Sequence, residues 1–172
     1  MTKLILSVTG SDRPGLTEAL AAAVLAAGGN WLESHLSRLG GLYVGSVLVE
    51  VAGGGAEALR QAVGEVDGRG LEVRVAAALE APTPEHGDVL ALDVVGQDRP
   101  GIVHQVTRAL TAIGVNIESF DTRLSVEAHS GAPLFHLDAR VRLPAGVDAG
   151  RVQGALEAIS AEIMVDIAVS PA

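Results

Sequence analysis

A six-residue motif occurs twice in this chain of 172 residues, and its two copies lie 86 residues apart. The first copy is Gly10-Ser11-Asp12-Arg13-Pro14-Gly15, and the second is Gly96-Gln97-Asp98-Arg99-Pro100-Gly101. Each copy follows a short apolar run and precedes an amphipathic one, which is the order of a strand, a tight turn and a helix. Because the offset is half the chain length, the repeat predicts two similar folding units.

Hydrophobic periodicity predicts six elements in the first half. They are a strand over 3–9, a helix over 16–27, strands over 30–39 and 42–51, a helix after 55, and a strand over 71–79. Gly40-Gly41 is a two-residue hairpin signal. The run 42–51 is apolar on both faces, so we expect it either in a buried sheet or at an edge joined to another sheet.

The second half repeats this order after a linker that contains two prolines. Strands are expected over 88–95, 116–126, 134–143 and 163–169, with a helix after each of the first and third. The hairpin loop over 127–133 is longer than its counterpart. The predicted organisation is a domain over 1–80, a linker over 81–87 and a domain over 88–172.

The order β-α-β-β-α-β in each half predicts an α+β protein of two ferredoxin-like domains. Each domain is expected to have an antiparallel four-stranded sheet with both helices on one face. Further pairs support the repeat: Asn30 matches Asn116 at the offset of 86. Glu33-Ser34 matches Glu118-Ser119 at an offset of 85, which predicts one extra residue in the first copy.

The overall charge narrows the classes of function. The formal net charge is −9, and no basic stripe or run of stacking aromatics offsets it, so direct nucleic-acid binding is not expected. The chain has no cysteine, and its five histidines fall on different elements, so we expect no metal site and no cofactor. It has no secretory leader and no stretch that spans a membrane, which predicts a cytoplasmic protein.

Two ferredoxin-like units, each with Asp-Arg-Pro-Gly at the first strand–helix turn and Asn at the head of the second strand, resemble tandem ACT domains. The specific resemblance is to the glycine cleavage system transcriptional repressor family, and it covers the whole chain. The segments that carry it are 9–15, 38–41, 96–101, 116–119 and 129–135.

This resemblance implies a regulator that binds a small amino acid, with glycine or serine as the leading candidates. It also implies action through a protein partner, either a DNA-binding regulator or an enzyme. ACT units usually pair side by side and extend their sheets, with ligand between them, so a homo-oligomer is expected. The pairing could occur within one chain or between two.

The residues of each turn suit the two charged groups of a free amino acid. The N-terminus of a helix attracts a carboxylate, and glycine at position 15 or 101 permits close approach. An aspartate could meet the ammonium, an asparagine can donate and accept, and an arginine could clamp the carboxylate. The candidate ligand-binding residues are Ser11, Asp12, Arg13, Pro14, Gly15 and Asn30 in the first unit, and Gln97, Asp98, Arg99, Pro100, Gly101 and Asn116 in the second.

A purely structural interpretation of the same motif stays open. The aspartate can cap the helix by accepting a backbone N–H, and proline suits the first helical turn. Arg38 and Arg123 are expected to pair with Glu33 or Asp121 on a sheet face. The loop that contains His129 is expected to cover a ligand or contact a partner.

Two other functions remain as alternatives. One is a protein-interaction module of the ACT type that binds no ligand and regulates an enzyme or transcription factor. The other is an enzyme, since ACT units precede catalytic domains in formyltetrahydrofolate deformylases. No residues remain in this sequence for such a domain, so we expect a non-enzymatic protein.

Overall fold

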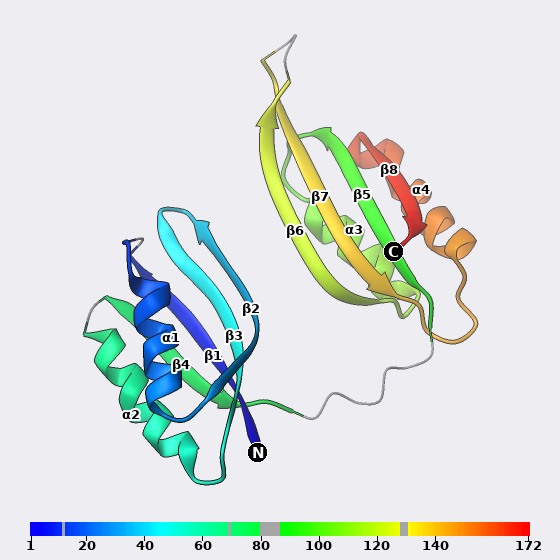
Figure 1. Ribbon diagram of the computed structural model, residues 1–172. Helices are drawn as coiled ribbons and strands as arrows, with labels where there is room; N and C mark the ends of the chain where they lie inside the picture. Colours follow the sequence, from blue (N-terminus) through cyan, green and yellow to red (C-terminus); the bar gives the residue numbers. More distant parts are fainter. Residues whose placement is uncertain (12, 69, 80–86, 128–130) are drawn as a thin grey trace. The chain divides into compact units, whose positions relative to one another are not determined.

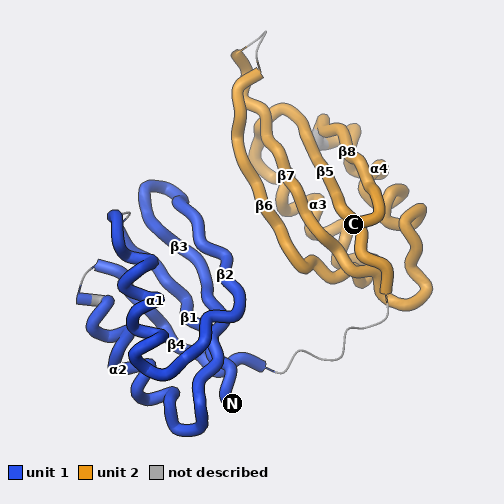
Figure 2. The backbone as a smooth tube through the Cα atoms, in the orientation of Figure 1, with its two compact units in different colours: residues 1–81 blue, residues 82–172 orange. Residues whose placement is uncertain are grey.

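The computed structural model describes residues 1–172 except 12, 69, 80–86 and 128–130. The chain divides into two compact units, unit 1 over 1–81 and unit 2 over 82–172 (Figure 2). Each has its own hydrophobic core, so the two are described separately. The linker predicted over 81–87 lies almost entirely outside the described residues.

Unit 1 is one four-stranded antiparallel sheet in the order β2-β3-β1-β4, with α1 and α2 on one of its faces (Figure 1). The other face, here called the outer face, carries no helix. The elements of this unit are β1 (Thr2–Ser11), α1 (Leu16–Ala26), β2 (Asn30–Leu39), β3 (Leu42–Val51), α2 (Gly55–Asp67) and β4 (Leu71–Ala77).

Unit 2 repeats the arrangement with the sheet order β6-β7-β5-β8, and α3 and α4 cover one face (Figure 1). The predicted α+β class and the β-α-β-β-α-β order are therefore confirmed. The elements of unit 2 are β5 (Val89–Gln97), α3 (Ile102–Ala112), β6 (Asn116–Val126), β7 (Pro133–Arg142), α4 (Ala149–Ile163) and β8 (Val165–Pro171). The last strand begins two residues later than predicted, because α4 continues to Ile163.

Both cores use the same positions of the repeat. Leu16, Leu20 and Val24 of α1 are buried, and so are Ile102, Val106 and Leu110 of α3, each 86 residues later. In β1 and β5 the buried residues alternate with exposed or half-buried ones, as expected for strands with one face on the core. The central strand β3 pairs on both sides, with β1 and β2, so it is not an edge strand. Its apolar outer-face residues Val44 and Leu48 are half-buried within the unit.

The strand register corrects one expectation about the repeat. Both β2 and β6 contain a β-bulge at the same place, between Trp31 and Glu33 in one strand and between Ile117 and Ser119 in the other. Asn30 and Asn116 keep equivalent pairing, and so do Glu33 and Ser119, at a constant offset of 86. The first copy therefore has no extra residue in this strand, and the sequence matches at an offset of 85 do not reflect structural equivalence.

Candidate functional site

The repeated motif forms the turns between β1 and α1 and between β5 and α3. Gly15 and Gly101 occupy the N-cap positions of the two helices, with left-handed φ angles of 90° and 100°. Glycine adopts this conformation without steric cost, and it has no side chain to cap the helix. Neither N-cap residue therefore satisfies the first-turn N–H groups of its helix, and among the described residues those of α3 have no side-chain cap.

This geometry corrects the structural interpretation of the motif. Pro14 and Pro100 precede the N-cap glycines, so neither proline lies in the first helical turn. Asp98 is exposed, and its backbone N–H donates to the carbonyl of Pro133 at 3.0 Å. Its carboxylate does not cap α3. Asp12 lies outside the described residues.

The first glycine of each motif is required for a different reason. A Cβ on Gly10 would lie 2.2 Å from the carbonyl oxygen of Gly70, and one on Gly96 would lie 2.5 Å from that of Met164. Both contacts are with the neighbouring backbone at the start of β4 or β8, which cannot move aside as a side chain can. These glycines allow the turn that ends α2 or α4 to approach the end of β1 or β5.

Arg13 and Arg99, the arginines of the two motif copies, lie close to the turns that precede β4 and β8. Nε of Arg13 donates to Oγ of Ser11 at 2.8 Å, and its guanidinium lies beside Gly70. The guanidinium of Arg99 donates to the backbone carbonyl of Glu162, near the end of α4. Arg99 thus ties the motif to the turn before the last strand of its unit, whereas Arg13 bonds within the motif and lies beside the equivalent turn. Gln97, which takes the place of Ser11 in unit 2, is exposed.

The two asparagines lie at the other end of each sheet. Asn30 aligns through Glu50 with Lys3, near the start of β1, whereas the motif begins where β1 ends. Eight residues of strand separate Lys3 from Ser11, a distance of about 26 Å. Asn116 is in the equivalent position in unit 2, through Arg142 and Val89. Within one unit, the structure does not bring the asparagine and the motif together.

The first helical turns differ in charge between the units. Glu18 lies in the first turn of α1, whereas α3 has no acidic residue in its first turn and carries His104 at the equivalent position. A carboxylate near a helix N-terminus interacts favourably with the helix dipole. Glu18 already supplies that negative charge in α1, so the end of α3 is the more favourable place for a carboxylate ligand.

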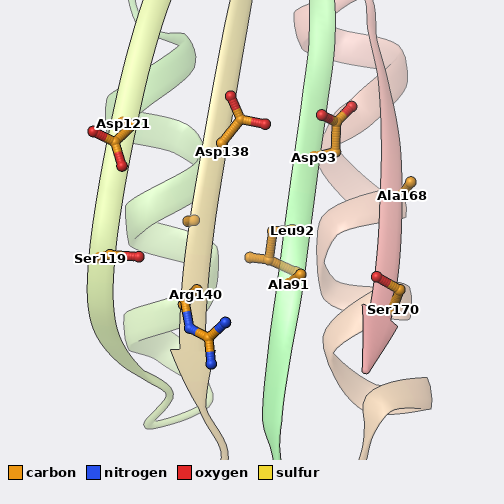
Figure 3. A pocket seen from close by; sticks show the side chains of 10 residues that line it. Ala91, Leu92, Asp93, Ser119, Asp121, Asp138, Arg140, Ala168 and Ser170 are labelled. Carbon is orange, nitrogen blue, oxygen red and sulfur yellow. The ribbon is translucent and has the colours of Figure 1, made fainter. Parts of the chain in front are cut away.

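A shallow pocket of about 330 Å³ lies on the outer face of the sheet in unit 2 (Figure 3). Asp121, Asp138 and Asp93 pair in register across β6, β7 and β5, and they form a row of three carboxylates. Arg140 lies in the next row, between Ser119 and Ala91. In the sequence, Asp138 is one of the polar residues that alternate with apolar ones along the strand expected over 134–143, which predicts only that it is exposed. The row depends on the register of three strands, which the sequence does not reveal.

The environment of this row perturbs one carboxyl group. Desolvation raises the pKa of Asp93 above its ordinary value, and a hydrogen bond with Asp138 and the charge of Asp138 raise it further. Arg123 and His136 oppose these effects. Arg123 forms its ion pair with Asp138 rather than with Asp121, which corrects the predicted partner.

Two kinds of feature are absent from the described part of the chain. There, no three acidic or histidine side chains converge closely enough to hold a metal ion. None of the helices in those residues has the length and hydropathy needed to cross a membrane. The prediction about the His129 loop falls on residues 128–130, outside the described residues.

Comparison with known proteins shows which family and which relatives this chain resembles. Residues 2–75, nearly all of unit 1, match the family model of the ACT domain. The chain is 31% identical over 172 residues to the phosphoserine phosphatase SerB2 of Mycobacterium tuberculosis, and the match covers 96% of this chain but only 40% of that protein. It is 23% identical over 164 residues to the glycine cleavage system transcriptional repressor of Escherichia coli, with coverage of 93% and 85%.

A solved structure extends the comparison to both units. A protein of unknown function from Galdieria sulphuraria superimposes with a TM-score of 0.87 at 27% identity, over 99% of this chain and 98% of that one. The fold and the repeated turn thus define a protein of two tandem ferredoxin-like units. Unit 1 belongs to the ACT domain family, and the chain has a tandem ACT architecture in which unit 2 repeats the fold.

Proposed function

We propose that this protein is a non-enzymatic regulator that senses a small amino acid, glycine or serine, and acts through a protein partner. The observation that carries the proposal is the pair of helix N-termini that follow the repeated motif. Each begins at a glycine, which has no side chain to cap the helix, so we expect the first-turn N–H groups to bind a carboxylate. The names of the relatives give the candidate ligands: one refers to glycine cleavage and the other to phosphoserine.

The ligand site in this proposal is shared between two ACT units. Asn30 and Asn116 begin β2 and β6, which are edge strands. Antiparallel pairing of two such edges would bring the asparagine end of one unit toward the motif end of the other. The turn would then hold the ligand carboxylate, while the asparagine and the exposed Asp98 would hold its ammonium. Arg13 and Arg99 each make one hydrogen bond within their own unit, and their remaining N–H donors could still contact the ligand carboxylate.

Action through a protein partner fits the charge of the chain. A net charge of −9 repels the nucleic-acid backbone, so a DNA-binding regulator or an enzyme is the partner proposed here. Amino-acid binding would alter the pairing of the units and thereby the surface offered to that partner. The phosphatase relative is longer than this chain, and its activity is not transferred to it.

The first test is a thermal unfolding experiment with glycine, L-serine and other amino acids. A ligand at about a hundred times its Kd adds roughly 2.7 kcal/mol, which raises the melting temperature of a domain of this size by about 10–20 °C. A rise with glycine or serine alone supports the proposal. No rise with any amino acid, together with capture of a partner by the ligand-free chain, would instead identify a pure interaction module.

The substitution His104→Glu distinguishes an effect on amino-acid binding from an effect on folding stability. A carboxylate in the first turn of α3 stabilises the helix by about 0.3–1 kcal/mol but competes with the ligand carboxylate. We therefore expect a higher melting temperature without ligand and an amino-acid affinity about two- to fivefold lower. His104→Gln is the matched control, because it removes the imidazole without adding charge.

Release of phosphate from O-phospho-L-serine by the purified chain would contradict the non-enzymatic part of the proposal.

A further inference from the structure

Helix α1 has an exposed face that is unusually apolar. From Ala19 to Gly29 the sequence contains no polar side chain. The structure buries one face of this helix in the core and leaves Ala21, Ala22, Leu25 and Ala26 exposed. Leu25 is the most prominent of these, at 75% exposure. We call the line from Glu18 through Ala22 to Leu25 the α1 crest.

The equivalent helix in unit 2 does not share this property. It buries residues at the same positions of the repeat, but it exposes His104, Arg108 and Thr111. A helix that is apolar on all sides is normally buried on all sides, whereas a helix with one polar face lies at a surface. The α1 crest therefore has the composition of an interface, and the outer face of α3 does not.

A groove of complementary character runs between α3 and α4. Its volume is about 310 Å³. One half is apolar and consists of Ala109, Ala112 and Ile159, while the other half is polar and contains His104 near the start of α3, Arg108 in the middle of that helix and Glu162 of α4. The side chain of Glu162 in this half accepts a hydrogen bond from Gln105, at 3.5 Å.

The spacing of the crest matches the spacing of the groove. Glu18 and Leu25 are seven residues apart, a rise of about 10.5 Å along the helix. With α1 parallel to α3 and Leu25 beside Ala112, Glu18 comes level with Gln105, between His104 and Arg108. The leucine then fills the apolar half, and the carboxylate enters the polar half, where Arg108 offers a positive charge and Glu162 carries a negative one. Ala22, between the two, allows the helices to approach closely.

We propose that the α1 crest of one molecule docks in the α3–α4 groove of a second copy of this chain. Each copy carries one crest and one groove, so a two-fold arrangement forms the contact twice and closes. A single helix-in-groove contact is small compared with a stable interface of about 1,600 Å², and two contacts bring the area closer to that size. The contact uses helix faces rather than strand edges. Glu18 and His104 lie in the first helical turns next to the proposed ligand site, whereas Leu25 and Ala112 lie in the last turns of α1 and α3, so substitutions at these two positions test the docking apart from ligand binding.

The test measures the mass of the full chain by sedimentation equilibrium. We expect an assembly that Leu25→Glu and Ala112→Glu each reduce to half its mass. Both positions are exposed, so neither change disturbs a core. Val103→Glu, on a side of α3 away from the groove, and Gln61→Glu, on α2, are the controls expected to keep the assembly. A wild-type chain with the mass of one 17.5 kDa molecule overturns the proposal and is the result expected for docking within a chain.

A mixing experiment tests which surfaces meet. The Leu25→Glu chain retains its groove and the Ala112→Glu chain retains its crest, so an equimolar mixture regains one of the two contacts. We expect the mixture, but neither variant alone, to contain the larger species. Loss of assembly in Leu25→Glu but not in Ala112→Glu would mean that the crest meets some other surface, such as a second crest, and would overturn the proposal.

Charge-reversal variants at Glu18 and Arg108 test the proposed alignment of the two helices. Glu18→Arg alone and Arg108→Glu alone each weaken the assembly roughly two- to thirtyfold, since each change affects two exposed ion pairs per dimer. The chain with both substitutions reverses each pair and is expected to recover. Failure of the double variant to recover, with both single variants weakened, contradicts the parallel alignment.

Discussion

The two units share a core and differ in their surfaces. Their buried helix positions repeat at an offset of 86, and each sheet has the same strand order and the same bulge. In contrast, the middle row of the outer face changes completely. It carries Asp121, Asp138, Asp93 and Ala168 in unit 2, and His35, Ser46, Ser7 and Arg74 in unit 1.

The ends of the units differ in a similar way. Unit 1 has Gly70 at the turn before its last strand, with a φ of 94°, and unit 2 has Met164 there, with a φ of 50°. The first turn of α1 carries Glu18 where α3 carries His104. Packing therefore maintains the same fold in both halves, while the exposed residues of the two units are free to differ. Four predictions follow from this comparison, ordered by the size of the expected effect.

The largest expected loss of stability concerns the first glycine of the motif, which both units share. Gly10→Ala and Gly96→Ala each place a methyl group against backbone, so each is expected to destabilise its own unit by about 3 kcal/mol, the upper end for overpacking. Trp31, the only tryptophan, reports urea unfolding of unit 1, and circular dichroism reports both units. Gly53→Ala and Gly154→Ala have open space and serve as controls. Equal stability of Gly10→Ala and Gly53→Ala would refute the close-approach argument.

The second effect concerns Gly70 and Met164. A left-handed conformation costs a residue other than glycine about 1–2 kcal/mol. Gly70→Ala should destabilise unit 1 by about that amount and displace Arg13 from Ser11. Met164→Gly should stabilise unit 2 by about 1 kcal/mol or less, because greater freedom of the unfolded chain offsets part of the gain. Thermal melts of both variants test this pair, and a lower melting temperature for Met164→Gly would contradict it.

The third prediction makes unit 1 resemble unit 2 in charge. Glu18→Gln removes a favourable interaction with the dipole of α1, so we expect unit 1 to lose about 0.3–1 kcal/mol of stability. The same change should raise the affinity of that helix end for an amino acid about two- to fivefold. Isothermal titration with glycine and serine measures the affinity. Glu57→Gln, on α2, is the control. An unchanged affinity would indicate that the ligand carboxylate does not bind at α1.

The smallest effect concerns the aspartate row. Because the pKa of Asp93 is raised in the folded state, the folded protein binds more protons than the unfolded chain just above the ordinary value of 3.8. Stability therefore falls as the pH rises through the window between 3.8 and the raised pKa. Asp93→Asn removes this loss and should stabilise unit 2 by a few tenths of a kcal/mol at pH 7, since exposed charges are screened. The two proteins should have equal stability at a pH below 3.8, and a difference that persists there would exclude charge as the cause.

Much of the fold could be predicted from the repeat and the alternation of apolar residues. Leu16, Leu20 and Val24 already mark the buried face of α1, and the turn residues mark where elements end. The limits of prediction appear where two distant segments meet. The bulge in β2, the pairing of Arg123 with Asp138 and the row through Asp93 all depend on strand register, which sequence spacing does not determine.

The candidate site shows the same limit in another form. The motif correctly predicted a turn at the start of each first helix. It did not predict that Gly101 would take the N-cap position in place of Asp98, because a left-handed glycine and a capping aspartate are both consistent with the same four residues. Asn30 was grouped with the motif by sequence order, whereas the parallel course of β1 and β2 places it at the opposite end of the sheet.

That separation of asparagine from motif has a consequence for how such a sensor would respond. A ligand that needs both groups can bind fully only after two units have associated, so its binding and their association are linked equilibria. If those units belong to different molecules, the apparent affinity for the amino acid rises with the concentration of the protein itself. The amount of protein in the cell would then set the amino-acid level at which it responds.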